Sequence, residues 1–96
     1  MNHKILLVDD DKELLAALKI KLLKEGFEID TAPDGEVALE KVKANQPDLV
    51  ILDVNMPNMN GMDVCRTLRS DEKTRDLAII MLTARDDEVD RILGLE

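Results

Sequence analysis

The sequence predicts an α/β fold built on an open parallel sheet, and three observations lead to this fold class. Short, fully apolar runs end abruptly in polar residues at Ile5–Val8, Leu49–Leu52 and Leu77–Leu82, as expected of strands buried on both faces. Amphipathic segments with helical spacing separate these runs. Ninety-six residues, without an internal repeat or a linker, make one domain at most. Strands that alternate with helices form parallel βαβ units with right-handed crossovers.

The first strand is expected at residues 5–8, where an apolar run meets three consecutive aspartates. A helix should follow and should end at Gly26, a typical residue after a helix C-terminus. Its leucines at helical spacing are Leu15, Leu18 and Leu22. In residues 27–32 apolar and acidic side chains then alternate, which predicts a strand with one solvent-exposed face at the edge of the sheet.

The second half of the chain repeats this alternation. A turn at residues 33–35 precedes a second helix, which should end before Pro47. The strand at residues 49–52 leads into a loop rich in Asn, Pro and Gly, and then into a short third helix around residues 64–68. After the last apolar strand, Asp86 can begin a fourth helix.

Composition narrows the functional classes. A formal net charge of -8 without a visible basic patch argues against direct binding of nucleic acid and favours a divalent cation or a basic partner surface. Cys65 is the only cysteine, so no internal disulfide can form, as expected for a cytoplasmic protein. We interpret Cys65 as a small buried apolar residue. The sequence contains no apolar stretch long enough for a signal peptide or a membrane span.

The candidate functional residues follow three of the expected strands. Asp9 and Asp10 end the first, Asp53 ends the strand at residues 49–52, and Thr83 ends the last. Because the carboxyl ends of parallel strands form the ligand-binding edge of such a sheet, these residues should converge on one cleft. Crowded carboxylates repel one another unless a cation lies among them, and oxygen ligands suit Mg²⁺. A metal-bound carboxylate can also be a nucleophile toward phosphorus.

Three sequence blocks resemble the receiver domain of bacterial two-component response regulators. They are Ile5 to Asp10 (ILLVDD), Leu49 to Gly61 (LVILDVNMPNMNG) and Ile79 to Ala84 (IIMLTA). The resemblance implies a flavodoxin-like, doubly wound sheet with strand order 2-1-3-4. It also implies a phosphoacceptor switch rather than an enzyme, with a histidine kinase as the phosphoryl donor.

The same resemblance implies a role for each matching residue. Asp53 would accept the phosphoryl group. Asp10 and Asp53, together with the backbone carbonyl of Asn55, would ligate Mg²⁺, and Asp9 would act through a metal-bound water molecule. Thr83 would turn its hydroxyl toward the phosphate and so couple phosphorylation to a change at the surface.

The sequence departs from the family pattern in two respects. Asn60 stands where the family usually has Asp before the loop glycine, which we expect to be a mild change. The family's fifth strand, fifth helix and phosphate-contacting lysine have no counterpart in residues 1–96, so we expect a receiver domain that is incomplete at its C-terminal side. Lys4 begins the first strand and lies at the wrong end of the sheet to replace that lysine.

Two other functions remain open at this point. The chain could be a truncated or engineered receiver fragment that associates with itself, as a homodimer or by strand exchange, through the apolar edge at Leu77–Leu82. It could instead be a phosphatase with an aspartate nucleophile. Such enzymes typically have an Asp-x-Asp pair on the nucleophile strand, whereas this chain has Asp53, Val54 and Asn55, which argues against this function.

Overall fold

A computed structural model describes residues 3–54, 56 and 59–82. They form a four-stranded parallel sheet with the order β2-β1-β3-β4, as expected. The strands are β1 (Lys4–Val8), β2 (Glu28–Ala32), β3 (Leu49–Asp53) and β4 (Ala78–Leu82). The helices are α1 (Lys12–Lys24), α2 (Gly35–Asn45) and α3 (Gly61–Ser70).

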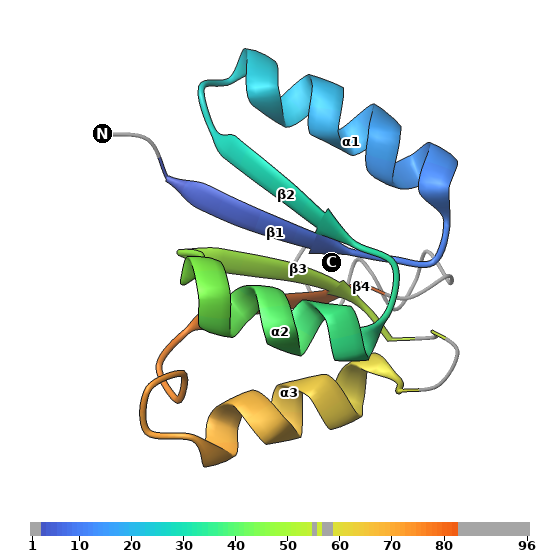
Figure 1. Cartoon of the computed structure of the whole chain (residues 1–96). Helices are drawn as coiled ribbons and strands as arrows, with labels where there is room; N and C mark the ends of the chain where they lie inside the picture. Colours follow the sequence, from blue (N-terminus) through green and yellow to red (C-terminus); the bar gives the residue numbers. More distant parts are fainter. Residues whose placement is uncertain (1–2, 55, 57–58, 83–96) are drawn as a thin grey trace, which may run out of the picture.

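The sheet forms the middle layer of the molecule. Helix α1 covers one face, while α2 and α3 lie side by side on the other (Figure 1). The side chains of β1 are therefore shared between two cores: Leu6 and Val8 pack toward α2 and α3, and Ile5 and Leu7 pack toward α1. This explains why the first strand is apolar at every position, since both of its faces are buried.

Each described helix begins at a side-chain cap. Asp11 Oδ1 accepts hydrogen bonds from the Glu13 and Leu14 N–H groups at 3.1 Å, and Asp34 Oδ1 accepts one from the Val37 N–H group at 2.9 Å. Such caps satisfy N–H groups that have no partner inside the helix. The caps allow α1 and α2 to begin within a few residues of the ends of β1 and β2, so only short connections follow these two strands.

The end of α1 agrees with the sequence prediction. Gly26 has a φ of +93°, a left-handed conformation that favours glycine. Its N–H group donates to the carbonyl of Leu23, and the next N–H group, that of Phe27, donates to the carbonyl of Leu22. The turn leads directly into β2, which is an edge strand of the described sheet, as the alternation of its side chains predicts.

Some expectations need refinement or fall elsewhere. Cys65 is half-buried rather than buried, because it lies one position away from the side of α3 that carries the buried residues Val64 and Leu68. Thr83, Asn55 and the helix expected from Asp86 lie outside the described residues. None of the helices in the described ranges is long and apolar enough to cross a bilayer.

Candidate metal centre at the carboxyl ends of the strands

Three aspartates meet where β1 and β3 end. One carboxylate oxygen from each of Asp9, Asp10 and Asp53 lies within 4.8 Å of the other two. The register explains the meeting: Val8 is paired with Leu52 in neighbouring parallel strands, so Asp9 and Asp53, the next residue on each strand, lie close together at the ends of β1 and β3. The convergence expected from the sequence is confirmed for these three residues.

The donor set suits a hard cation. In an octahedral Mg²⁺ site with metal–oxygen distances of about 2.0–2.1 Å, adjacent ligand oxygens are about 2.9 Å apart and opposite ones about 4.1 Å apart. The three carboxylate oxygens lie within 4.8 Å of one another, which is close to such spacing. Asp10 is exposed while Asp9 and Asp53 are half-buried, so water can complete a coordination shell from outside, as Mg²⁺ usually requires.

The third residue of the aspartate run has a different task. Asp11 caps α1, and its own N–H group donates to Asp9 Oδ1 at 2.9 Å. This bond holds one oxygen of Asp9 toward the backbone of the turn. Of the three consecutive aspartates, Asp9 and Asp10 therefore belong to the acidic cluster, and Asp11 caps α1.

The electrostatics of Asp9 reflect its neighbours. Partial burial is the main cause that raises the pKa of its carboxyl above the ordinary value, and the hydrogen bond from the Asp11 N–H group opposes this effect. The negative charges of Asp53 and Asp10 raise it further. Carboxylates held in this way are costly to keep ionised together, and a bound cation removes that cost.

A tight backbone contact sets the position of β3 relative to α3. A side chain at Gly61 would collide with the carbonyl oxygen of Asp53 and would approach Val54 Cα to 2.9 Å. The Gly61 N–H group also donates to the Val54 carbonyl at 2.9 Å. Only glycine permits this approach, so the loop after Asp53 returns to the strand that it has just left and begins α3 there.

Asn60 has a role that the sequence comparison missed. Its Oδ1 accepts a hydrogen bond from the Asp63 N–H group at 3.0 Å and caps α3. Asn and Asp are about equally good at this position, which explains why the departure from the family pattern is mild. The sequence indicates this cap, because Asn is a common N-cap residue and Asn60 stands directly before α3.

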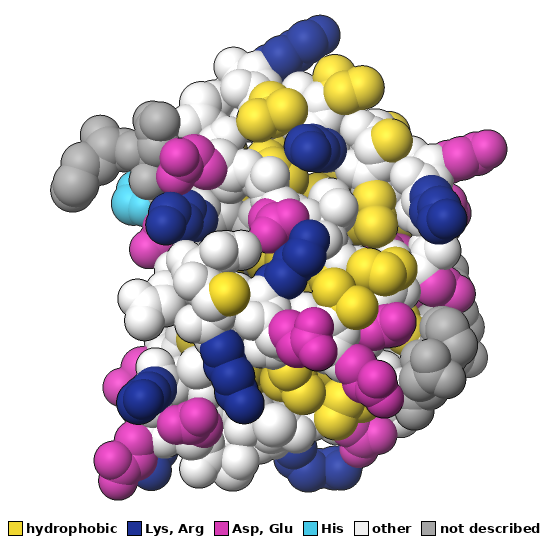
Figure 2. All heavy atoms as spheres, viewed as in Figure 1, with side chains coloured by type: hydrophobic (Ala, Val, Ile, Leu, Met, Phe, Trp, Pro, Cys, Tyr) yellow, Lys and Arg dark blue, Asp and Glu magenta, His cyan; other side chains and the backbone are white. Residues whose placement is uncertain are grey.

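Among the described residues, the acidic cluster lies at the surface, with Asp10 exposed. Two hollows in the described part of the chain lie toward the opposite ends of the strands, one beside Lys4 and Glu28 and the other between Gln46 and Leu77. Lys4 also lies at that end, so the described residues confirm that it cannot reach Asp53. Figure 2 shows acidic side chains on the side toward which the strands point as well as on the opposite side. A small ion suits an exposed cluster of carboxylates better than a buried organic ligand does.

Comparison with known proteins agrees with this geometry. The family model of the response regulator receiver domain matches residues 5–96. The chain belongs to the response regulator receiver family. The match covers both the strand ends that carry the acidic cluster and the loop that follows Asp53.

Two curated relatives illustrate the similarity. The chain is 45% identical to the alkaline phosphatase synthesis transcriptional regulatory protein PhoP of Bacillus subtilis and 50% identical to the DNA-binding response regulator MtrA of Mycobacterium tuberculosis. Each alignment covers 100% of this chain, but only 39% of PhoP and 41% of MtrA. The chain therefore spans about two fifths of the length of these relatives.

Solved structures share the fold. A putative response regulator from Chloroflexus aurantiacus aligns with a TM-score of 0.87 at 37% identity, covering 98% of this chain and 77% of that one. A chemotaxis response regulator of Vibrio cholerae aligns with a TM-score of 0.84 at 31% identity, covering 98% and 82%. The doubly wound, flavodoxin-like architecture expected from the sequence is therefore the observed one.

Proposed function

We propose that the chain is a phosphoacceptor module of a two-component system, in which Asp53 receives a phosphoryl group from a histidine kinase. The observation that carries this proposal is the meeting of Asp53 with Asp9 and Asp10 at the end of the sheet. Membership of the receiver family supports the same role. Neither the self-associating fragment nor the phosphatase gains support from the comparisons.

The residues divide the chemistry between them. A carboxylate oxygen of Asp53 would attack the phosphorus of the kinase's phosphohistidine. The phosphorus–nitrogen bond would break, and its electron pair would stay on the imidazole. Asp10 and Asp53, with Asp9 acting through water and with the carbonyl of Asn55, would hold Mg²⁺, which supplies positive charge next to the phosphoryl oxygens. Thr83 would offer its hydroxyl to the same oxygens.

Exposure agrees with transfer between two proteins. Asp10 is exposed and Asp53 is half-buried, which supports the approach of a phosphohistidine carried by another protein. The close contact at Gly61 holds the backbone of Asp53, which fixes the nucleophile while the donor approaches. In PhoP and MtrA the matching segment belongs to a transcriptional regulator and a DNA-binding regulator, and we propose a similar output for a longer protein that contains this chain.

The test is a phosphorylation assay with a small donor. The chain is incubated with Mg²⁺ and acetyl phosphate, and the adduct is located by mass spectrometry after borohydride trapping. We expect one phosphoryl group on the parent chain and none on Asp53→Asn. The matched control is Asp48→Asn, which removes an exposed aspartate at the opposite end of the sheet. A folded parent chain without an adduct, or an adduct that survives Asp53→Asn, would contradict the proposal.

A further inference from the structure

The outer edge of β2 is the feature that the proposed function leaves unexplained. The Glu28 N–H group donates to the His3 carbonyl at 2.9 Å, and the Ala32 carbonyl accepts from the Asp9 N–H group at 3.1 Å. In a parallel ladder alternate residues bond to the same neighbour, so the backbone groups of Ile29 and Thr31 point away from β1. Such outward groups are a template on which another chain can pair.

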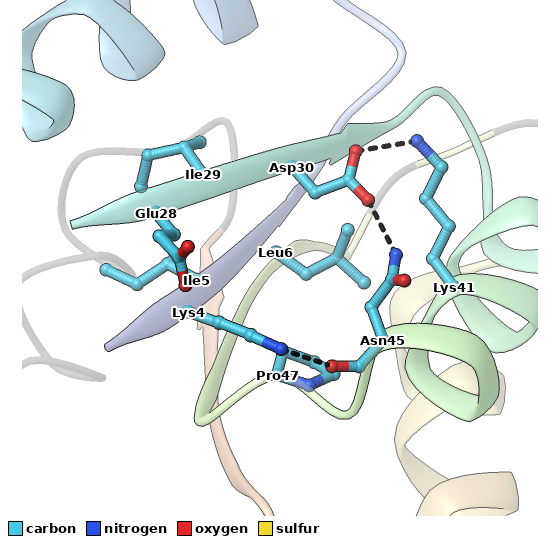
Figure 3. A pocket seen from close by; sticks show the side chains of 9 residues that line it. All are labelled: Lys4, Ile5, Leu6, Glu28, Ile29, Asp30, Lys41, Asn45 and Pro47. Carbon is cyan, nitrogen blue, oxygen red and sulfur yellow. Dashed lines mark hydrogen bonds and ion pairs between the residues drawn. The ribbon is translucent and has the colours of Figure 1, made fainter. Parts of the chain in front are cut away.

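Side chains occupy both outward backbone groups of Thr31. Its N–H group donates to Asp30 Oδ1 at 2.8 Å, and its carbonyl accepts from Lys41 Nζ at 2.5 Å. Lys41 Nζ also donates to Asp30 Oδ1 at 2.8 Å, and Asn45 Nδ2 donates to Asp30 Oδ2 at 3.0 Å. We call Asp30, Lys41 and Asn45 the edge latch (Figure 3).

The edge latch crosses a hollow rather than a packed interface. Lys41 and Asn45 come from α2, while Asp30 comes from β2. Between them and the start of β1 lies a cavity of about 200 Å³, with Leu6 and Pro47 among its lining residues (Figure 3). Apolar contact between the second half of α2 and this edge is therefore incomplete, and the polar bonds make the connection.

We propose that the edge latch closes the outer edge of β2 against strand addition by a second copy of this chain. A second copy is the natural partner because two identical edges become self-complementary when they run antiparallel about a two-fold axis. In a pairing centred on Asp30, Ile29 of each copy would lie opposite Thr31 of the other, and each pair would need the groups that the latch already holds. The arrangement would also place the two Asp30 carboxylates face to face, which is unfavourable.

Lys41 occupies the Thr31 carbonyl and neutralises Asp30. Its ammonium group fills the acceptor that an incoming N–H group would take, and it neutralises the carboxylate beside it. Glu28, on the same face of the same strand, has no ion pair or side-chain hydrogen bond within the described ranges. The closure therefore depends on Asp30 and its partners and not on acidity alone, which provides a matched control.

The experiment compares Asp30→Val with Glu28→Val in the complete chain. Both substitutions remove one negative charge from the same face of β2 and introduce the same strand-favouring side chain, but only the first removes the latch, together with the Asp30 carboxylates that would face each other in the pairing. Sedimentation is measured over a hundredfold concentration range, together with amide hydrogen exchange. We expect Asp30→Val to form dimers in which the Ile29 and Thr31 amides become protected as concentration rises. Glu28→Val should match the parent chain.

Association that is equal in both variants, or absent from both, would overturn the proposal. Protection in the amides of β4 instead of β2 would also overturn it, because that result assigns the contact to the other edge. A second comparison does not depend on association: Lys41→Met against Lys43→Met at low concentration. The first should speed exchange of the Thr31 amide about threefold through local opening, and equal rates in the two variants would contradict a latch.

Discussion

Aspartates in two regions of the same sheet, the acidic cluster and the edge latch, have pKa values shifted in opposite directions. At the carboxyl ends of the strands, burial and like charges raise the pKa of Asp9. In the edge latch, partial burial also raises the pKa of Asp30, but the hydrogen bonds from Lys41, Thr31 and Asn45 outweigh it, and the net pKa is lowered. The first group brings like charges together, whereas the second pairs its carboxylate with a lysine. The difference indicates which carboxylates are arranged for a ligand and which hold the fold together.

Of the changes considered, saturation with Mg²⁺ should have the largest effect on the stability of the fold. A ligand that binds only the folded state stabilises it by about 2.7 kcal/mol when its concentration is a hundred times Kd. We expect a clear rise in Tm for the parent chain and a much smaller one for Asp10→Asn, measured by calorimetry. An equal rise for both proteins would place the ion outside the acidic cluster.

Removal of the Lys41 ammonium group from the edge latch should have the next largest effect on stability. In Lys41→Met the apolar stem is retained, but Asp30 and the Thr31 carbonyl lose their shared donor. Because the pair is partly exposed, we expect a loss of about 1 kcal/mol in the free energy of unfolding, measured with urea. Lys43→Met, on the exposed side of the same helix, should change it by less than about 0.5 kcal/mol. Equal losses would show that Lys41 contributes only its stem.

Neutralising Asp9 should have a smaller effect and the opposite sign. Asp9→Asn removes a charge that is disfavoured in the folded state without metal, while its side-chain oxygen can still accept from the Asp11 N–H group. After discounting for solvent screening, we expect a gain of at most about 0.5 kcal/mol, or about 2–4 °C in Tm. Addition of Mg²⁺ should reverse the order of the parent and the variant. A loss of stability without metal would contradict strain at the cluster.

The pH dependence should be the smallest effect and should separate the two groups by sign. Asp30 has a lowered pKa when folded, so it stabilises the fold above the ordinary aspartate pKa of about 3.9 and loses this contribution as pH falls through the lowered value. Asp9 has a raised pKa, so its cost to the folded state is present at neutral pH and is relieved as pH falls through the raised value. Carboxyl chemical shifts from NMR, recorded without metal, should give the higher midpoint for Asp9.

Parts of the molecule with local causes could be predicted from the sequence. The apolar runs predict β1, β3 and β4, and the alternation in residues 27–32 predicts that β2 lies at an edge. Gly26 marks the turn that follows the end of α1. The strand order and the roles of the site residues came from family resemblance rather than from patterning. Asn60 shows the limit of local reasoning, since it was assigned only to the family motif although its side chain caps α3.

The sequence by itself determined that acidic residues follow two buried strands, because abrupt changes from apolar to charged residues require the chain to leave the core at those points. The parallel-sheet prediction also brought Asp9, Asp10 and Asp53 together, but only the tertiary structure showed how close they lie and that Asp30 meets a lysine. Asp9 and Asp53 are brought together by the pairing of β1 with β3, and Asp30 reaches Lys41 because α2 lies beside β2 in the folded chain. Electrostatic energy depends on distances of a few ångströms, and packing between distant segments sets those distances.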